Sequence, residues 1–484
     1  MIHATASPLD FTTFYNIIDN QLTQTSKTRH GINPANKKPN PPVPISTQDD
    51  LVKAVNAARV AFNGWSKTTW DVRRKALFAW ADAVDANADG FAKTLTMEQG
   101  KPLSQAGMEV GWAVEWIRGL SSIEITDNVL DETKDRKIIQ RYTPLGVVGA
   151  IVPWNYPILL AVVKIVSAVY TGNSVIVKPS PFTPYCDLKL VELATRFFPP
   201  GVVQCLSGDD SLGPMITEQP GIDKISFTGS TVTGKLVMAS CAKTLKRVTL
   251  ELGGNDAAII CEDVDIDAVI PEVAIKSYLS SSQTCMMIKR LYVHEKIYDD
   301  FLKKLVAFVK ALKVGEGTEP DVFFGPVQNQ MQFEKAKDLL STISTDKLKA
   351  ALGGSVEPSS GYFIQPTIID NPPESSRVVR EEPFAPILPV MKWSNEDDVI
   401  NCANALEAGL SSSVWTKDLD RASRIADQMQ SGSVWVNTHL DLLPAASYGG
   451  HKQSGIGVEG GLSGLLEYCN SQTQWLKKKG DTGA

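Results

Sequence analysis

The chain has 484 residues, more than one ordinary domain contains, so two or three domains with sizeable cores are expected. Hydrophobic residues make up 43% and charged residues 21%, the composition of an ordinary globular protein. A formal net charge of -6 gives no sign of a nucleic-acid partner, and no apolar run reaches the roughly 18 residues of a transmembrane helix, so no membrane partner is expected.

The cysteines and histidines indicate a reducing compartment and no metal site. Seven cysteines are scattered without a CxxC pair, and a chain this long needs no disulfide framework. The five histidines lack zinc-binding spacing. Because the first residues also lack the basic and apolar regions of a secretory signal, we expect free thiols and a cytoplasmic location. The cysteines are Cys186, Cys205, Cys241, Cys261, Cys285, Cys402 and Cys469.

The N-terminal part is predicted to be rich in helices. The stretch Pro39–Pro44 is predicted to be a loop, because proline cannot continue a helix. Ser46 followed by Asp49 forms a capping pattern, and apolar residues at spacings of three and four predict a helix from Leu51 onward. A second helix is expected at residues 71–87.

From residue 147 onward, short apolar runs alternate with helical patterns, which predicts a parallel α/β sheet. Ligands bind outside the carboxyl ends of the strands in such sheets, so residues that follow each strand gain weight. A second α/β region is expected from the strand at 248–252 to about residue 447, and the stretch 134–142 is expected to protrude as a strand. The other predicted strands are 147–152, 174–178, 202–206 and 224–227, and the helices between them are 158–169, 185–198 and 211–218.

Three candidate site residues follow predicted strands. Asn155, in the rigid turn PWNYP, could donate to a developing oxyanion, although asparagine also favours ordinary turns. Lys178 could meet ribose or phosphate oxygens, or it could end in solvent. Gly229, in FTGSTVTG, could present backbone N–H groups to an anion or simply make a turn between strand and helix. Taken singly, each residue leaves both interpretations open.

Cys285 and Glu251 are candidates for chemistry. Cys285 lies in SSSQTCMMIKR, just before a predicted strand at 291–294. Most lone cysteines are buried and inert, and a reactive one needs a lowered pKa. Glu251 ends a run of Val, Thr and Leu, where a solvent-facing glutamate is hard to explain.

Together these segments resemble the aldehyde dehydrogenase superfamily, over nearly the whole chain and in the order typical of that family. Any single match is modest evidence, but so many matches in one order are very specific. The matching segments are NPA at 33–35, EQGKP at 98–102, PWNYP at 153–157, KPS at 178–180, FTGS at 227–230, ELGGN at 251–255, QTC at 283–285, EEPF at 381–384 and GGHKQSGIG at 449–457.

The resemblance implies an α/β fold with three parts and a homodimeric or homotetrameric assembly. These parts are a Rossmann-type cofactor domain (1–122 and 145–251), a catalytic α/β domain (252–447) and a small β oligomerisation arm with the tail (123–144 and 466–484). It also implies Cys285 as the nucleophile, Glu251 as the general base, and Asn155 with the backbone N–H of Cys285 as the oxyanion hole. The implied contacts to NAD, with NADP as the alternative, are Trp154, Lys178, Ser180, Gly229, Ser230, Glu382 and Phe384.

The implied reaction oxidises a small-molecule aldehyde to the carboxylic acid. A thiolate attacks the aldehyde to give a thiohemiacetal, and fixed donors stabilise its oxyanion. Hydride leaves to the nicotinamide, and Glu251 activates water that hydrolyses the remaining thioester.

The chain departs from the family pattern at positions that bear on specificity. Pro181 stands where a glutamate often grips the adenosine ribose, which weakens the preference for NAD over NADP. Ser280 and Ser282 replace usual residues before the nucleophile, and a serine at the usual glycine strains the loop if its φ is positive. Near the expected substrate tunnel, Tyr448 adds a hydroxyl and Val163 is smaller than the usual aromatic residue, which favours a bulky, hydroxylated or aromatic aldehyde.

Two other functions stay open. A CoA-acylating or reductive thioester-forming enzyme has the same fold, but acyl transfer to CoA does not need the base that Glu251 would supply. A catalytically silent relative would explain Ser280, Ser282 and Ala385, the last of which replaces a usual glycine. The intact set of Asn155, Lys178, Glu251, Cys285 and Glu382 argues against a silent protein.

Overall fold

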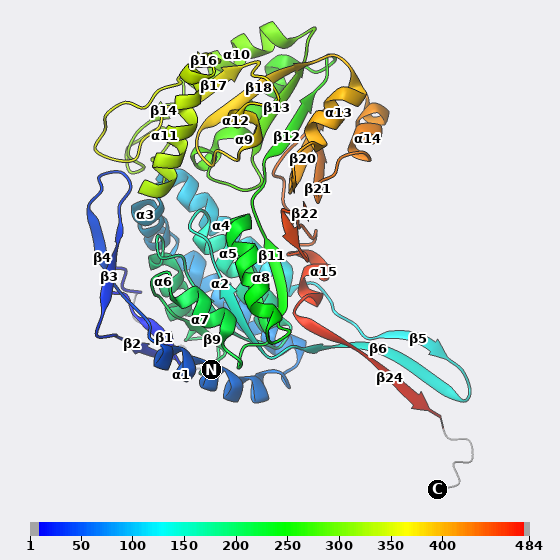
Figure 1. The fold of residues 1–484 in the computed structure, drawn as a ribbon. Coiled ribbons are helices and arrows are strands. Elements are labelled where there is room, and N and C mark those ends of the chain that lie inside the picture. The colour runs from blue at the N-terminus through cyan, green and yellow to red at the C-terminus, as the bar shows by residue number, and fades with distance from the viewer. Residues whose placement is uncertain (1–8, 479–484) are drawn as a thin grey trace.

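A computed structural model describes residues 9–478, and this part of the chain forms two large, mostly parallel sheets and a slender arm (Figure 1). Helices cover both faces of each large sheet, so the central strands are buried on both sides and can consist of continuous apolar runs. The predicted α/β class is therefore confirmed. No helix in this described part is both long and apolar enough to cross a membrane.

The first sheet has eight strands within the described residues, in the order β2-β1-β9-β8-β7-β10-β11-β23. Its five central strands run parallel, while β1, β2 and β23 pair antiparallel at the two edges. The strands are β1 (Asn16–Ile18), β2 (Gln21–Thr23), β7 (Val147–Ile151), β8 (Ser174–Lys178), β9 (Val203–Cys205), β10 (Lys224–Thr228), β11 (Arg247–Glu251) and β23 (Gly455–Ile456).

Two helical layers enclose this sheet. The apolar side chains of one layer form the largest core, and the other layer covers the opposite face of the sheet. The first layer consists of α2 (Trp70–Ala86), α3 (Ala88–Gln99), α4 (Leu103–Ser121), α5 (Pro157–Tyr170) and α6 (Tyr185–Ala194), and the second of α1 (Gln48–Trp65), α7 (Leu212–Glu218) and α8 (Thr231–Ala242).

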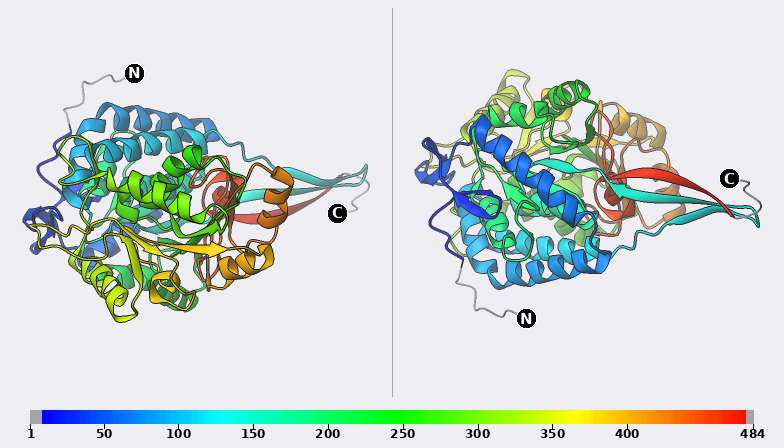
Figure 2. Two further views of the ribbon diagram at one scale, coloured as in Figure 1. Left: turned by 90° about the horizontal axis from the view of Figure 1, so that it is seen from above. Right: turned by 90° about the horizontal axis from the view of Figure 1, so that it is seen from below.

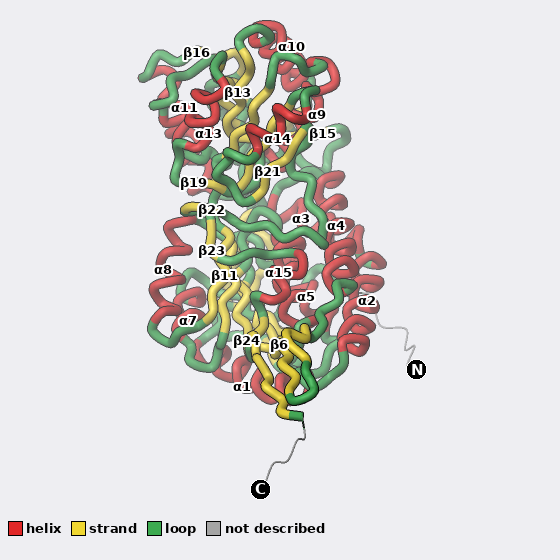
Figure 3. The backbone as a smooth tube through the Cα atoms, turned by 90° about the vertical axis from the view of Figure 1, so that its right-hand side faces the viewer, coloured by secondary structure: helices red, strands yellow, loops and turns green. Residues whose placement is uncertain are grey.

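The second sheet has seven strands within the described residues, in the order β16-β17-β18-β13-β12-β20-β21, and only β16 runs antiparallel to its neighbour. Figure 3 shows the strands of the two sheets one above the other, with β22 and β23 near the junction. The strands are β12 (Asp256–Ile260), β13 (Ile288–His294), β16 (Lys349–Leu352), β17 (Thr367–Asp370), β18 (Ile387–Trp393), β20 (Ser411–Trp415) and β21 (Ser433–Val436). Helices α9 (Ile266–Tyr278) and α10 (Tyr298–Lys310) cover one face, and α11 (Gln330–Thr345), α12 (Arg377–Arg380), α13 (Glu396–Asn404) and α14 (Leu419–Ala426) cover the other.

The arm is an antiparallel sheet in the order β24-β6-β5, and it projects away from the body in both views of Figure 2. Its strands are β5 (Asn128–Glu132), β6 (Arg136–Pro144) and β24 (Cys469–Lys477), so the prediction of a protruding strand at 134–142 is confirmed. Residues 479–484 of the predicted arm and tail lie outside the described residues, and the Lys478 N–H donates to the Asp135 carbonyl of the arm. The short elements are η1 (Leu279–Ser282), β14 (Lys313–Val314), β15 (Val322–Phe324), β19 (Ala408–Gly409), β22 (His451–Lys452) and α15 (Gly461–Leu466).

Two local predictions near the N-terminus were wrong. Pro39–Pro44 is not a loop but strand β4, which among residues 9–478 pairs only with β3 (Thr28–Ile32). An edge strand tolerates prolines because their missing N–H groups can face away from the partner. The α1 cap is Thr47 with Asp50, one residue later than predicted, because Ser46 is buried and donates to the Ser207 carbonyl at 2.6 Å.

Candidate active site

A cavity of about 360 Å³ brings together the three residues that the sequence assigned to catalysis. Asn155 follows β7, Glu251 ends β11 of the same sheet, and Cys285 precedes β13 of the second sheet. The cavity thus lies at the carboxyl ends of β7 and β11, where parallel α/β sheets place their ligands. Because the three residues are far apart in the chain, it is the packing of the two sheets that joins them.

The turn before the predicted nucleophile holds three serines in the left-handed backbone region. The φ angles are 54° at Ser280, 54° at Ser281 and 60° at Ser282, so the conditional prediction of strain at the serine that replaces the usual glycine, Ser282, is confirmed. Each such residue costs about 1–2 kcal/mol. The Ser280 N–H donates to Gln105 Oε1 at 2.9 Å, and Ser281 Oγ donates to the Gly325 carbonyl at 2.8 Å. These bonds hold the strained turn in one conformation.

Glu251 is buried beside Cys285 and is suited to accept protons. Within residues 9–478 neither carboxylate oxygen has a hydrogen-bond partner of ordinary geometry. Burial raises the pKa of Glu251 to about 7, and the Cys285 thiol opposes part of that rise. Burial and the Glu251 carboxylate raise the pKa of the Cys285 thiol. The raised pKa of Cys285 favours its thiol form, and Glu251 is the carboxylate beside it.

A buried ion pair supports the turn that carries Asn155. Lys101, between α3 and α4, pairs with Glu109 of α4, and both side chains are almost fully buried. Lys101 Nζ also donates to the Asn155 carbonyl at 2.9 Å and lies 3.6 Å from the centre of the Tyr156 ring. The Asn155 amide lines the cavity, so its direction depends on a backbone that Lys101 holds.

The predicted phosphate-binding residues lie at the ends of β8 and β10. Lys178 ends β8 and is buried, and this burial lowers its pKa to about 8. Ser180 follows two residues later and is also buried. Ser230 caps α8, with its side chain accepting from the Thr233 N–H at 3.2 Å. A cation at the end of β8 and the N-terminus of the twelve-residue helix after β10 are groups that fit the ribose and phosphates of a dinucleotide.

The other cofactor contacts that the resemblance implies are Trp154, Gly229, Glu382 and Phe384. The Trp154 and Phe384 rings meet edge to face, with centroids 5.3 Å apart. Glu382 lies against Gly253, where an added Cβ would come within 2.6 Å of Glu382 Oε2. Gly229 is similarly tight, because an added Cβ would come within 2.6 Å of the Phe227 ring. The Glu382 carboxylate can accept hydrogen bonds from ribose hydroxyls, and the Trp154 and Phe384 rings can pack against a planar group. These side chains therefore fit the nicotinamide half of a dinucleotide.

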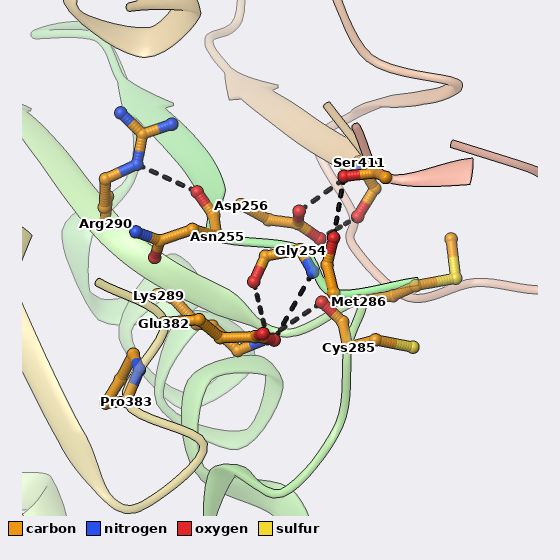
Figure 4. Close-up of polar contacts among 12 residues, drawn as sticks. Gly254, Asn255, Asp256, Cys285, Met286, Lys289, Arg290, Glu382, Pro383 and Ser411 are labelled. Carbon is orange, nitrogen blue, oxygen red and sulfur yellow. Dashed lines mark hydrogen bonds and ion pairs between the residues drawn. The ribbon is translucent and has the colours of Figure 1, made fainter. Parts of the chain in front are cut away.

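The structure adds a residue that sequence reasoning missed, Lys289. Its ammonium pairs with Glu382 Oε1 at 2.6 Å and donates to the Cys285 carbonyl at 2.8 Å (Figure 4). The signal in the sequence was a lysine at the start of the run IKRLYVH, whose residues are all buried. Nothing in that run indicated that the lysine would turn toward the nucleophile.

A second buried network corrects the expected role of Tyr448. Lys164 and Glu459 form a fully buried ion pair, and Ser226 Oγ donates to Glu459 Oε1 at 2.9 Å. The Tyr448 hydroxyl donates to Glu459 Oε2 at 3.2 Å. Tyr448 therefore lines the cavity, but its hydroxyl is engaged by Glu459 and does not supply a free polar group for the substrate.

The remaining departures change local surroundings only. The Arg29 guanidinium donates to the backbone carbonyl of Pro181, so a cation lies close to the position where the family often has a glutamate. Ala385 is buried in the second core. In the described part of the chain, no three His, Cys, Asp or Glu side chains are grouped to hold a metal ion.

Comparison with known proteins agrees with this arrangement. Residues 22–474 match the model of the aldehyde dehydrogenase family. Aldehyde dehydrogenase LUC3 from a Fusarium species is 40% identical over 472 residues, which cover 97% of this chain and 100% of that protein. Phenylacetaldehyde dehydrogenase from Pseudomonas fluorescens is 34% identical, with 93% of each chain covered.

Solved structures give the same result. Betaine aldehyde dehydrogenase from Staphylococcus aureus, solved in complex with NAD+, superposes with a TM-score of 0.94 at 31% identity and covers 98% of this chain and 97% of its own. The chain belongs to the aldehyde dehydrogenase family, an enzyme family that oxidises aldehydes. The resemblance, the fold class and the enzyme class expected from the sequence are thereby confirmed.

Proposed function

We propose that the protein oxidises an apolar aldehyde to its carboxylic acid, with Cys285 as nucleophile, Glu251 as base and Asn155 as oxyanion donor. The observation that carries this proposal is the convergence of these three side chains on one cavity. A free thiol beside an unpartnered carboxylate is the arrangement that covalent catalysis by cysteine requires.

In the first step the Cys285 thiol gives its proton to Glu251, and the sulfur forms a bond to the aldehyde carbon. Glu251 can accept this proton near neutral pH because its pKa is about 7. The electron pair of the carbonyl moves to oxygen, and the Asn155 amide and the Cys285 backbone N–H donate to that oxyanion. Donors fixed in a dry site are worth about 3 kcal/mol each to such a step.

The acyl group is released in the last steps. A bound nicotinamide supplies the acceptor for the hydride that leaves the carbon, and a Cys285 thioester remains. Glu251 releases to solvent the proton that it took from Cys285 and then removes a proton from water. The resulting hydroxide attacks the thioester carbon, and the carbon–sulfur bond breaks. The carboxylic acid leaves, and the departing thiolate takes back the proton held by Glu251, which restores the thiol.

We infer that the hydride acceptor is NAD or NADP. The cation, helix cap, carboxylate and rings described above fit both halves of a dinucleotide. The residues that would hold it are Trp154, Lys178, Ser180, Gly229, Ser230, Glu382 and Phe384. The proline at position 181 and the nearby Arg29 support binding of NADP, with its 2′-phosphate, as well as NAD, with its 2′-hydroxyl.

The lining of the cavity supports a bulky apolar or aromatic aldehyde. Most of the lining is aromatic or aliphatic, and the charged lining residues are Glu115, Glu251, Lys276 and Asp441. Because the Tyr448 hydroxyl is engaged by Glu459, a hydroxylated substrate gains no evident partner there. The apolar lining residues are Trp112, Trp116, Tyr156, Leu159, Leu160, Val163, Met286, Leu440, Leu442, Leu443 and Tyr448.

Cys285→Ala tests the function directly. This variant should lose aldehyde oxidation in the presence of either cofactor, while cofactor binding measured by fluorescence titration survives. The matched control is Cys402→Ala, since Cys402 is also partly exposed but lies in the second core region. Parallel assays with and without CoA decide between hydrolysis and acyl transfer, because a dependence of turnover on CoA would contradict the proposed role of Glu251.

A substrate panel tests the aldehyde class. Phenylacetaldehyde and octanal should give higher kcat/KM than betaine aldehyde or glutarate semialdehyde, whose charges would enter an apolar cavity. Val163→Phe should raise KM for the aromatic aldehyde and leave acetaldehyde oxidation nearly unchanged. Efficient turnover of short aliphatic aldehydes alone would contradict the apolar class.

We also infer that the chain forms a homodimer or homotetramer. The arm carries Trp475 with 70% exposure, and α8 exposes Val232 and Leu236 four residues apart at 73% and 67%. Such apolar surface is typical of an interface. We further propose the domain ranges 1–122 with 145–251, 252–447, and the arm at 123–144 with 466–484, and free thiols at all seven cysteines suit a cytoplasmic protein. The oligomeric state is measurable by light scattering.

A further inference from the structure

Lys289 makes three polar contacts with three different segments around the nucleophile. Its ammonium donates to the Cys285 carbonyl at 2.8 Å, to Glu382 Oε1 at 2.6 Å and to the Gly254 carbonyl at 3.3 Å. Figure 4 shows these contacts together, with Lys289 between the loop after β11, the turn that carries Cys285 and the EEPF segment. A lysine ammonium has three donors, so all of them are used.

The neighbouring cation does not share this role. Arg290 points to the opposite side of β13 and donates to the Asn255 carbonyl at 2.8 Å and the Ala403 carbonyl at 2.8 Å (Figure 4). Successive side chains of a strand alternate between its faces, so only Lys289 can face the site. Its side chain is fully buried, whereas that of Glu382 retains 23% exposure.

The charges around the Cys285 sulfur are otherwise unfavourable to a thiolate. Burial, Glu251 and Glu382 all raise the thiol pKa, and Lys289 lowers it. Of the other groups, Lys276 lines the same cavity, and burial lowers the pKa of His439 to about 3, so that imidazole is neutral. Asp256, bonded to Ser411, has a pKa raised to about 7 by burial.

We propose that Lys289 is a positioning residue for Cys285, which ties the nucleophile's carbonyl to Glu382 and keeps a positive charge near the sulfur. The inference rests on the proposed function, in which Cys285 is the nucleophile. The bond to the Cys285 carbonyl restricts rotation of that residue, so the sulfur keeps its direction toward the cavity. The ammonium also stabilises the anionic sulfur when it forms and when it leaves the acyl group.

The test measures thiol reactivity without aldehyde or added cofactor. The rate of alkylation of Cys285 by iodoacetamide is followed by peptide mass spectrometry between pH 6 and pH 10. Lys289→Met should move the midpoint of this profile upward by about one pH unit, so that alkylation below the midpoint is about tenfold slower. Glu382→Gln should move it downward, because a negative charge is removed while Lys289 remains.

Two controls separate charge from general damage. Lys289→Arg keeps the charge and should stay near the wild-type midpoint. Lys335→Met removes a lysine that contacts the same glutamate only through its backbone carbonyl, at 3.0 Å, and should leave the profile unchanged. If Lys289→Met does not yield folded protein, the comparison of Glu382→Gln, whose midpoint should fall, with Lys289→Arg, whose midpoint should stay at the wild-type value, still decides.

The proposal is overturned if the midpoint of the alkylation profile is unchanged in Lys289→Met. If Lys289→Met does not fold, an unchanged midpoint in Glu382→Gln overturns it. The function itself is tested separately in the same samples. If complete alkylation of wild-type Cys285 leaves aldehyde oxidation intact, the proposed function fails whatever Lys289 does. If alkylation abolishes oxidation but the midpoints do not shift, the function stands and only the role of Lys289 is refuted.

Discussion

Replacing Lys101 should damage both stability and oxyanion stabilisation, and the two effects are separable. In Lys101→Met the Glu109 carboxylate, almost fully buried, loses its charge partner. Leaving one charge of a buried pair unpaired costs about 3–5 kcal/mol of folding free energy. The variant also loses the donor to the Asn155 carbonyl, which lies at 2.9 Å, so the Asn155 turn is less well fixed.

The effect on catalysis follows from the role of Asn155. Complete loss of one oxyanion donor lowers kcat by about 100- to 1000-fold. Because Lys101 holds only the backbone of that donor, we expect kcat to fall by about tenfold to 100-fold, with little change in KM. The assays are steady-state oxidation of one aldehyde and urea unfolding of the same samples.

The double variant Lys101→Met/Glu109→Gln separates the two effects. It removes both charges and keeps a side-chain oxygen for the Leu159 N–H, which donates to Glu109 Oε1 at 3.2 Å. Neutral replacement of a buried pair is often close to neutral for stability, so the unfolding free energy should recover. The kcat should stay low, because the bond to the Asn155 carbonyl is still missing. Full recovery of kcat would refute the reasoning.

Three further predictions concern other residues of the site. The rate of thioester hydrolysis should fall as the pH drops below about 7, because Glu251 acts as a base only when deprotonated and its raised pKa is about 7. Stopped-flow measurement of acid release over pH 5–9 checks this, and the same dependence of the rate on pH in Glu251→Gln would count against it. Ser282→Gly should raise the unfolding free energy by about 1 kcal/mol, because glycine adopts a φ of 60° without strain, whereas Ser281→Gly should raise it less because it also loses the hydrogen bond to the Gly325 carbonyl. Equal increases of the two variants in urea unfolding would contradict this. Pro181→Glu should shift the NAD to NADP ratio of kcat/KM toward NAD by at least about fivefold, since the new carboxylate and the 2′-phosphate of NADP, about 4 Å apart, would repel by about 1 kcal/mol even in water. An unchanged ratio would mean that position 181 does not face the ribose.

The sequence was most informative where local pattern and burial agree. The parallel strands read as apolar runs because both faces of each sheet are covered, and strands such as β8 (Ser174–Lys178) match their predicted bounds. Cys285, Glu251 and Asn155 could be selected through the family motifs, and their grouping on one cavity follows.

The features that escaped prediction depend on contacts between distant segments. Lys101 and Lys164 look like ordinary helix or loop lysines, and only the packed structure pairs them with Glu109 and Glu459. Lys289 gave no signal because its partners come from other elements. Pro39–Pro44 became a strand because β3 offered an edge that needs no further neighbour, which composition alone does not reveal.

The central claim, that the acyl group passes through a bond to Cys285 and leaves by way of Glu251, is tested most directly by trapping that bond. Glu251→Gln is mixed with phenylacetaldehyde and cofactor, quenched in acid after the reduced cofactor has formed, and digested for mass spectrometry. The account predicts one equivalent of reduced cofactor, formed more slowly than in the wild type because the thiol lacks its base but still faster than acid is released, and the phenylacetyl mass on the peptide that contains Cys285. Steady turnover without a burst, an unmodified Cys285 peptide, or the acyl mass on another cysteine would contradict it.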